Sequence, residues 1–341
     1  MEYKRIVITH PGGPEVLQVI RESIPDPKPG EVLVKVLAAG VGRADMMMRR
    51  GQYPLSMPPL PFTPGYDIVG IVDNLGEGVT KFKPGAWVAA LTEVGGYTEY
   101  VCLSQEDLVA VPEGLDPAEV VCLILNGITA YQMLFRFAKI SAGEQVLFHA
   151  AGSGVGIIQL QLGKLAGLKM YGTETQRKHK MISDLGGTPI DYQSEDFVKR
   201  IRSLTGAGVD AVFDPVGGSH IWHSFRALRP KGRLIAYGEM AITGAQKPKK
   251  SEVWLHHYLP GLLNLVPGGR VVRWWEVFPE NQAHRDWYHQ DLAKLVELLS
   301  QGKIKPIVAE RIPLVEIARA HKLFESSTMI GKIVLICNEW R

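Results

Sequence analysis

Cysteine is scarce in this chain of 341 residues, and the three that occur, Cys102, Cys122 and Cys337, lie far apart. A zinc site usually takes pairs of cysteines separated by roughly two to four residues, and no such pair is present. We therefore expect buried, reduced thiols of the kind found in cytosolic proteins, and we expect a cytoplasmic location.

An excess of one charge and a long apolar run are also missing. The 38 basic and 35 acidic residues leave a net charge of +3, which is too balanced to indicate a nucleic-acid-binding protein, although local basic patches stay possible. The longest apolar run, Val120 to Leu125, is far shorter than the roughly 18 residues that a membrane span needs. The N-terminus has no apolar stretch of signal-peptide length. We expect no nucleic-acid partner and no transmembrane segment.

What is present indicates a globular protein of two domains, because the chain is longer than one hydrophobic core usually serves. Up to about Leu123, short strands broken by Gly and Pro indicate an antiparallel β domain. From there on, strands alternate with helices, a pattern typical of a parallel, doubly wound sheet. The stretch 241–285 is less regular, and the chain ends in a β-like segment.

A glycine-rich loop follows the predicted strand Gln145–His149 and leads directly into an apolar helix. At the start of a helix, backbone N–H groups and the helix dipole attract phosphate, and a Cβ would block its approach or the packing of the helix. The spacing departs from GxGxxG, so a tight turn without a ligand is the alternative. The expected dinucleotide contacts are Gly152, Ser153, Gly154, Val155 and Gly156.

Cofactor choice is usually decided at the end of the second strand, where an acidic residue binds the ribose of NAD and a cation accepts the 2′-phosphate of NADP. We expect Thr173 to stand in the acidic place, while Thr175, Arg177 and Lys178 can donate to a phosphate. This pattern favours NADPH. Glu174 is the opposing signal, because its carboxylate could bind the ribose hydroxyls.

Eight segments resemble the medium-chain dehydrogenase/reductase superfamily, in its zinc-independent, zeta-crystallin-like quinone oxidoreductase branch. The resemblance covers nearly the whole chain, and RKHKMISDLGGTPIDY with DPVGGS is most similar to homologues of the vesicle amine transport protein. It implies an α/β fold, with a GroES-like β-rich catalytic domain (1–122 with 303–341) and a Rossmann NADPH-binding domain (123–302). The segments are PGEVLVKVLAAGVGRAD, RRGQYP, PGYDIVGIV, GGYTEYV, LNGITAYQML, HAAGSGVGIIQLQLGK, GVDAVFDPVGGS and HKLFESSTMIGKIVL.

The ligands that zinc-dependent members of the superfamily use are replaced in this chain. Where those members have a cysteine and a His-Glu pair, this chain has Gly42 and Tyr66-Asp67. His220 and His223 are three residues apart, and His256-His257 are adjacent, but no Cys or carboxylate stands at ligand spacing from them. We expect exposed or capping histidines and no metal.

Tyr53 is the expected catalytic residue, because it matches a tyrosine that enoyl reductases of the superfamily use as the proposed proton donor. A phenol can donate a proton and is neutral at physiological pH, but an ordinary aromatic at the rim of the site is the alternative. Asp45 is expected to orient Tyr53 or a substrate water, or else to cap its helix. The asparagine of relatives is here Gly42, which puts a direct transfer of quinone specificity in doubt.

The resemblance also implies further cofactor contacts. Thr129 matches a residue on the carboxamide side of the nicotinamide, and Tyr192 matches an aromatic residue on the adenine side. Gly217 and Gly238 end parallel strands at the cofactor edge, where a side chain would crowd the dinucleotide. Each of these four could equally be a structural turn residue.

The tryptophan-rich segment RVVRWWEV predicts an edge strand near Val271–Val277 that pairs with its two-fold mate in a homodimer. An apolar substrate cover and a membrane-touching loop are the alternatives.

The function expected from these features is hydride transfer from NADPH to a small quinone or an α,β-unsaturated carbonyl without zinc. The first alternative is an enoyl-thioester reductase, for which the basic run QKPKK could hold a carrier or coenzyme A. The second is a non-enzymatic, NADPH-bound adaptor or binding protein.

Overall fold

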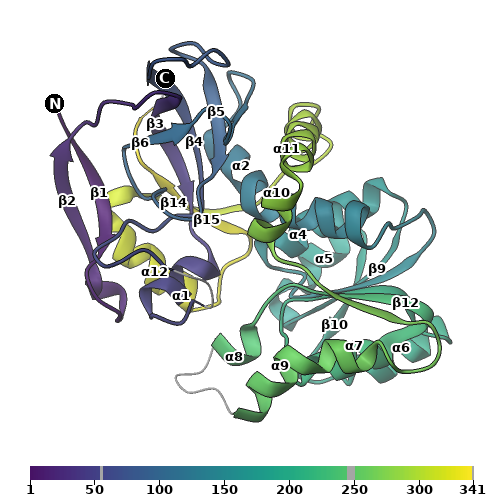
Figure 1. The fold of residues 1–341 in the computed structure, drawn as a ribbon. Helices are drawn as coiled ribbons and strands as arrows, with labels where there is room; N and C mark the ends of the chain where they lie inside the picture. Colours follow the sequence, from purple (N-terminus) through teal and green to yellow (C-terminus); the bar gives the residue numbers. More distant parts are fainter. Residues whose placement is uncertain (54–56, 244–249, 340–341) are drawn as a thin grey trace. The chain divides into compact units, whose positions relative to one another are not determined.

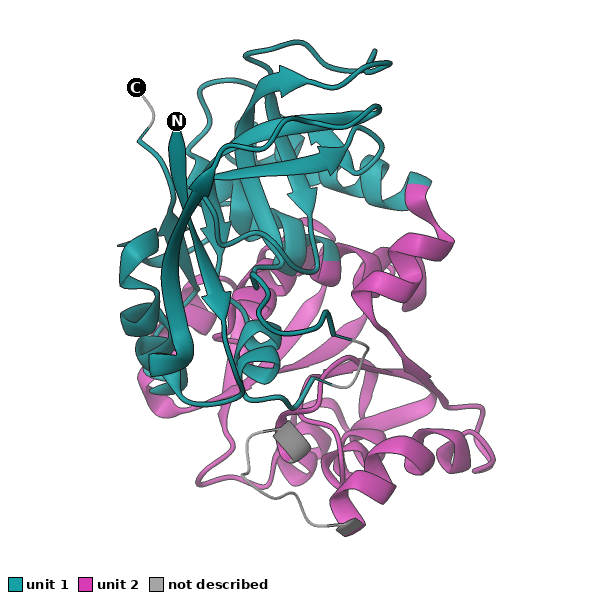
Figure 2. Cartoon of the chain, turned by 60° about the vertical axis from the view of Figure 1, so that its left-hand side comes forward, with its two compact units in different colours: residues 1–128, 286–341 teal, residues 129–285 magenta. Residues whose placement is uncertain are grey.

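The computed structural model describes residues 1–53, 57–243 and 250–339 (Figure 1). The chain divides into two compact units, unit 1 with Met1–Ile128 and Asp286–Arg341, and unit 2 with Thr129–Arg285 (Figure 2). The domain limits expected from the sequence differ from these units by residues 123–128 and 286–302, which group here with unit 1. Those limits stay a prediction.

Unit 1 is built on a seven-stranded, mostly antiparallel sheet in which β3 (Glu31–Gly40) is central. β3 is buried along most of its length, as its run of Val, Leu and Ala predicts. A separate antiparallel pair is formed by β1 (Glu2–Ile8) and β2 (Leu17–Ser23). The other strands of the large sheet are β4 (Asp67–Leu75), β5 (Trp87–Leu91), β6 (Tyr100–Ser104), β7 (Leu108–Ala110), β14 (Val308–Pro313) and β15 (Lys332–Ile336).

One helical stretch of the described residues, Pro117–Phe137, has the length and the hydropathy of a membrane span, with a mean hydropathy of 1.5. It contains α2 (Pro117–Cys122), α3 (Ile128–Tyr131) and two π-helical turns. Of its most apolar window, 72% is buried inside the structure, which is typical of a core helix. Unit 1 ends within this stretch, at Ile128. Its further helices are α1 (Arg43–Arg49), α11 (Arg285–Ser300, except for Arg285) and α12 (Ile317–Glu325).

Unit 2 is a parallel sheet of six strands in the order β10-β9-β8-β11-β12-β13. The order reverses between β8 and β11, which is the doubly wound arrangement that the sequence predicted. The strands are β8 (Gln145–His149), β9 (Lys169–Glu174), β10 (Gly187–Asp191), β11 (Val209–Asp214), β12 (Leu228–Ala236) and β13 (Val271–Trp274).

Helices cover both faces of this sheet (Figure 1). One buried cluster joins strand residues such as Leu147 and Val212 to Ile201 and Phe225 of two helices. Strands buried on both faces read as continuous apolar runs, which is why β8 and β11 were easy to predict. The helices are α4 (Gly154–Leu165), α5 (His179–Asp184), α6 (Phe197–Thr205), α7 (His220–Ala227), α8 (Met240–Thr243), α9 (Lys250–Leu263) and α10 (Val277–Ala283).

Candidate functional site

The carboxyl ends of β8, β9 and β11 bring polar residues to one edge of the unit 2 sheet. His149, Glu174 and Asp214 are the last residues of these three neighbouring strands. In doubly wound sheets, ligands bind outside the carboxyl ends of the strands where the strand order reverses. The candidate dinucleotide site is therefore this edge.

The glycine-rich loop has the backbone that an anion site needs. Ser153 caps α4, and its hydroxyl accepts the N–H of Gly156 at 3.1 Å. Within the described residues this leaves the N–H groups of Gly154 and Val155, at the start of the helix, for an anion. A Cβ on Gly156 would lie 2.6 Å from the carbonyl oxygen of Ala150. Only glycine fits there without a shift of the backbone.

Gly152 faces a buried ion pair at the corner of β9. Its N–H donates to Oε2 of Glu174 at 3.3 Å, and Nζ of Lys178 lies 3.3 Å from the same oxygen. A Cβ on Gly152 would come within 2.4 Å of Cδ of Lys178. The missing side chain therefore makes room for Glu174 and Lys178 as well as for a ligand.

Thr173 differs from its expected place. Its side chain is buried, and its hydroxyl pairs with Nδ1 of His149 at 2.8 Å. Since β9 continues to Glu174, the structure puts Glu174, rather than Thr173, at the strand end where an acidic residue binds ribose in NAD enzymes. Sequence alone does not indicate which of these two neighbours pairs with His149.

The other expected residues of this corner lie around Glu174. The N–H of Thr175 donates to Oε1 of Glu174 at 3.0 Å. Tyr192 follows β10 and is exposed, and burial of part of its ring together with the nearby charge of Glu174 raises its pKa. The structure thus brings Gly152, Thr175 and Lys178 into contact with one carboxylate, whose charge also acts on Tyr192.

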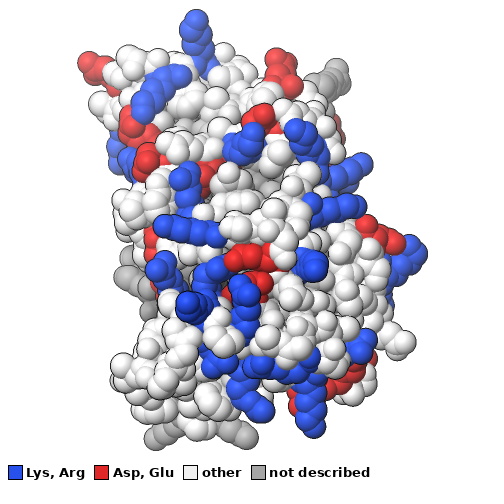
Figure 3. Space-filling model, turned by 90° about the vertical axis from the view of Figure 1, so that its right-hand side faces the viewer, with Lys and Arg blue, Asp and Glu red and all other residues white. Residues whose placement is uncertain are grey.

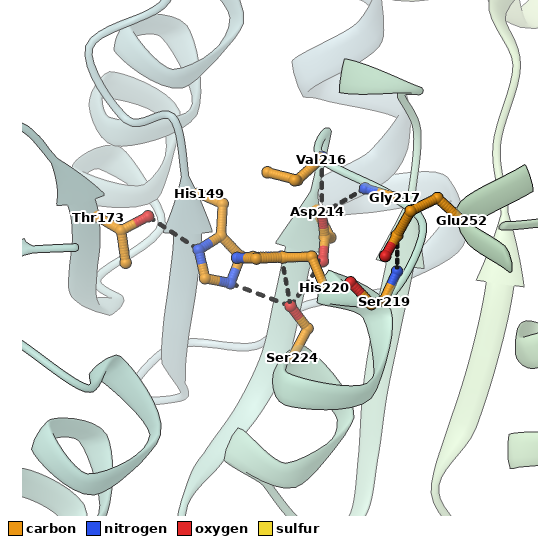
Figure 4. Close-up of polar contacts among 9 residues, drawn as sticks. All are labelled: His149, Thr173, Asp214, Val216, Gly217, Ser219, His220, Ser224 and Glu252. Atoms are coloured by element: carbon orange, nitrogen blue, oxygen red, sulfur yellow. Dashed lines mark hydrogen bonds and ion pairs between the residues drawn. The ribbon is translucent and has the colours of Figure 1, made fainter. Parts of the chain in front are cut away.

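Asp214 is the centre of a buried hydrogen-bond network that sequence reasoning missed (Figure 4). Oδ1 accepts the N–H groups of Val216 and Gly217 at 2.7 and 3.2 Å. Oδ2 accepts the hydroxyl of Ser224 at 2.6 Å and pairs with Nδ1 of His220 at 2.8 Å. Although burial opposes ionisation, His220 and the hydrogen bonds lower the pKa of Asp214.

His149 joins this network from β8. Its Nε2 lies 3.1 Å from the hydroxyl of Ser224, and burial lowers its pKa to about 3. The ligand atoms of His149, Asp214 and His220 lie within 4.8 Å of one another, a grouping that could hold a metal ion. The hydroxyl of Ser224 already contacts all three side chains, and we interpret the cluster as a hydrogen-bonded brace between β8, β11 and α7. The absence of a metal stays a prediction.

Gly217 and Gly238 pack against each other at the ends of β11 and β12. Gly217 has a φ of 75°, and a Cβ there would lie 2.8 Å from the carbonyl oxygen of Gly238 and 2.6 Å from Nδ1 of His256. His256 is buried, and its Nε2 lies 3.3 Å from Glu239. Both glycines are thus required by close packing whether or not a dinucleotide contacts them. Thr129 is buried at the start of unit 2.

Tyr53 contacts a second tyrosine in unit 1. Its hydroxyl forms a hydrogen bond with that of Tyr66, and the two rings meet edge to face, with centroids 6.2 Å apart and planes at 81°. Tyr66 is buried, and burial followed by the influence of Tyr53 raises its pKa far above the usual range. Tyr66 was noticed in the sequence only as a missing zinc ligand.

Asp45 is fully buried and holds two segments of backbone. Oδ2 accepts the N–H of Gly42 at 2.8 Å, which caps α1, and Oδ1 accepts the N–H of Gly65 at 3.1 Å. Burial raises its pKa to about 7 although the bond from Gly42 lowers it. The capping role weighed from the sequence is present, and the contact with Gly65 places Asp45 one residue from Tyr66.

Asp67, at the former Glu position of the zinc site, forms a buried ion pair with Lys332 of β15. Nζ and Oδ2 are 2.6 Å apart, and both side chains are almost fully inaccessible. A Cβ on Gly40 would come within 2.1 Å of Cε of Lys332. A glycine in β3 thus makes space for this pair.

A basic groove is lined by residues of α6 and α7 and lies apart from the carboxyl ends of the strands. It has a volume of about 470 Å³ and contains two stacked rings, Trp222 and Phe225. Figure 3 shows Lys and Arg side chains gathered over the side of the molecule on which α6 lies. The balanced net charge therefore hides a local patch, to which the groove contributes Lys199, Arg202, Arg226 and Arg270.

The segment expected to form a dimer is at the sheet edge. β13 pairs only with β12 among the described strands, and Val271 is exposed. Pairing with a second chain stays a prediction. The run QKPKK, considered for carrier binding, lies outside the described residues except for Lys250.

Comparison with known proteins gives matches over nearly the whole chain. The family description "Alcohol dehydrogenase GroES-like domain" matches residues 28–113, and "Zinc-binding dehydrogenase" matches residues 186–335. The synaptic vesicle membrane protein VAT-1 homolog of Danio rerio is 33% identical over 339 residues, which are 98% of this chain and 70% of that protein. Rat quinone oxidoreductase is 28% identical, with 95% of each chain covered. The structure of Escherichia coli quinone oxidoreductase complexed with NADPH is 30% identical, covers 98% of this chain and 99% of its own, and has a TM-score of 0.86.

Proposed function

This chain belongs to the medium-chain dehydrogenase/reductase superfamily, and on that premise we propose that it is an NADPH-dependent, zinc-independent reductase of quinones or α,β-unsaturated carbonyls. The observation that carries the proposal is the Tyr53–Tyr66 contact. It joins Tyr53 to Tyr66, a phenol that stands where zinc-dependent relatives hold a metal ligand.

Unit 2 would hold the cofactor. The open N–H groups of Gly154 and Val155 suit its pyrophosphate, and the glycines at 156, 217 and 238 keep Cβ atoms away from the loops around it. Lys178 suits the 2′-phosphate, with Thr175 and Tyr192 at the same corner. When bound, NADPH supplies the hydride. The NADPH complex of the Escherichia coli relative supports this assignment.

Unit 1 would supply the proton. Addition of hydride to an enone or a quinone leaves negative charge on oxygen, and a neutral phenol can donate the proton that completes the reduction. Tyr53 is half-buried and suits this role. Asp45 would act as a positioning residue, because its oxygens bond to backbone rather than toward an open space.

The residues at the former zinc positions do not suit a metal. Gly42 has no side chain, the hydroxyl of Tyr66 is bonded to Tyr53, and Asp67 is neutralised by Lys332. The charge of a buried carboxylate that pairs with an ammonium group is already balanced without a metal cation.

The test is NADPH oxidation by the purified protein with 1,4-benzoquinone, a 2-alkenal and crotonyl-coenzyme A in parallel. Turnover of the first two supports the proposal, and turnover of crotonyl-coenzyme A alone would favour an enoyl-thioester reductase. Tight NADPH binding without turnover of any acceptor would contradict the proposal. It would favour a binding protein, an alternative that the vesicle protein relatives keep open.

A further inference from the structure

We propose that Tyr66 is a positioning residue of the reaction, whose hydroxyl donates a hydrogen bond to the oxygen of Tyr53 and stabilises the phenolate that forms when Tyr53 gives up its proton. This inference rests on the proposed function for its chemistry and on unit 1 alone for its geometry. It assigns a role to a residue that stands where relatives with zinc have a ligand.

The direction of the hydrogen bond follows from burial. Tyr66 is only 3% exposed, whereas Tyr53 is half-buried. Burial disfavours the charged form of a phenol, so the pKa of Tyr66 lies far above its usual range and its proton stays in place. Of the two phenols, Tyr53 is therefore the one that ionises, and Tyr66 is the one that donates.

The backbone around Tyr66 fixes its ring in advance. Its carbonyl oxygen accepts the N–H of Thr92 at 2.7 Å, and the hydroxyl of Thr92 donates to the carbonyl oxygen of Gly65 at 2.8 Å. Asp45 accepts the N–H of Gly65, and Gly65 has a φ of 113° that disfavours other residues. A donor held in this way costs no reorganisation when charge develops on Tyr53.

The proton balance of the step is simple. The acceptor gains a hydride on carbon and a proton from Tyr53, the O–H bond of Tyr53 breaks, and its electron pair stays on the phenol oxygen. Tyr66 keeps its own proton throughout. Water returns a proton to Tyr53 before the next turnover.

The main experiment compares Tyr66→Phe with Tyr53→Phe and with the double variant. A hydrogen bond to a charged group contributes about 1.5–3 kcal/mol, so Tyr66→Phe should lower kcat about tenfold to a hundredfold. The KM for the acceptor should change by less than about twofold. The double variant should be no slower than Tyr53→Phe, because Tyr66 acts only through Tyr53. Additive losses would overturn the proposal.

A pH measurement separates this role from packing. Loss of the donor should make Tyr53 ionise at higher pH. The alkaline limb of the kcat profile should therefore move to higher pH in Tyr66→Phe. Among the described residues, the charges of Asp45 and Glu93 also raise the pKa of Tyr66. Both are carboxyls, and Asp45, with a pKa of about 7, titrates below the range of a phenol. An unmoved limb would contradict the proposal.

A measurement that does not depend on activity separates a failure of this inference from a failure of the proposed function. Carbon NMR of ζ-carbon-labelled tyrosine, with the signal assigned in Tyr53→Phe, should show the tyrosinate of Tyr53 at higher pH in Tyr66→Phe. If the wild-type protein reduces none of the acceptors, the proposed function fails while this titration still decides the donor role. The control is Tyr3→Phe, because Tyr3 is buried and meets Tyr100 with nearly the same geometry, 6.1 Å and 79°. It should change neither titration nor kcat.

Discussion

The two units hold their buried polar groups in different ways. In unit 2, His149, Ser224 and Asp214 share one negative charge through a chain of hydrogen bonds at the ends of adjacent strands. In unit 1, Asp67 and Lys332 form a single ion pair between residues 265 positions apart. The first arrangement distributes the charge over several donors. The second depends on one cation, Lys332, together with the N–H of Leu125 at 3.2 Å.

The largest expected effect is the loss of that cation. Lys332→Met leaves Asp67 buried and unpaired, which should lower the free energy of unfolding by about 3–5 kcal/mol. Chemical denaturation followed by circular dichroism measures it. Asp67→Leu combined with Lys332→Met removes both charges and should recover much of the loss. A single variant as stable as the wild type would show that the pair is not needed.

A backbone contact in unit 2 should have the next largest effect. Gly156→Ala forces a Cβ to within 2.6 Å of backbone atoms of Ala150 and Ala151. We expect a loss of about 1–3 kcal/mol of stability and weaker NADPH binding by calorimetry. Gly261→Ala is the control, since a Cβ there meets nothing within 4 Å. Equal effects of the two changes would argue against a packed loop.

Acid should act on both units through buried neutral histidines. Burial lowers the pKa of His149 in unit 2 and of His321 in unit 1 to about 3. Between that value and about 6.5, only the unfolded chain gains the proton, so stability falls as the pH falls, by about 1.4 kcal/mol per unit for each histidine. His149→Gln should reduce this slope by up to about 1.4 kcal/mol per pH unit, the contribution of one proton.

The histidine experiment has a control on the same helix as His220. His223→Gln makes the same substitution at an exposed position and controls for the change of side chain itself. A slope unchanged in His149→Gln would mean that His149 is protonated in the folded protein.

The smallest effect concerns cofactor choice. Lys178→Glu removes the cation at the end of β9, and we expect the ratio of NADPH to NADH affinity to fall about tenfold or more. Lys180→Glu, at an exposed position, should have little effect. Glu174→Gln should move the ratio the other way, because a carboxylate repels a 2′-phosphate. If Lys178→Glu weakens both cofactors equally, the assignment of Lys178 is wrong.

The sequence predicted the fold of unit 2 because each strand and helix of a parallel sheet has a pattern that a short segment contains. Apolar strands such as Gln145–His149 and a capped helix starting at Gly154 can be recognised within a few residues, and the strand order then places their ends together. What it missed was side-chain direction. Thr173 and Glu174 are both buried, but Thr173 pairs with His149, whereas Glu174 contacts Lys178 and the glycine-rich loop. The family resemblance identified the fold class, and the matches confirm it.

Unit 1 was harder to predict because its contacts join distant segments. Nothing in the letters PGYD indicates that Tyr66 meets Tyr53 or that Asp67 meets Lys332. Loop path determines the first contact, and the strand order β15-β3-β4 determines the second. In the stretch 241–285 the sequence predicted only a strand near Val271–Val277, where the structure has β13, and it did not predict α8, α9 and α10. The residues proposed for catalysis and cofactor binding stay predictions until variants are measured.

The bond between Gly152 and Glu174 has a consequence for binding measurements. In the glycine-rich loop, the N–H of Gly152 already donates a hydrogen bond to an oxygen of Glu174 at 3.3 Å. Any dinucleotide that takes this N–H must first displace an internal competitor. Cofactor affinity then includes the cost of breaking this bond, and in Glu174→Gln, which has no carboxylate, we expect that cost to be smaller.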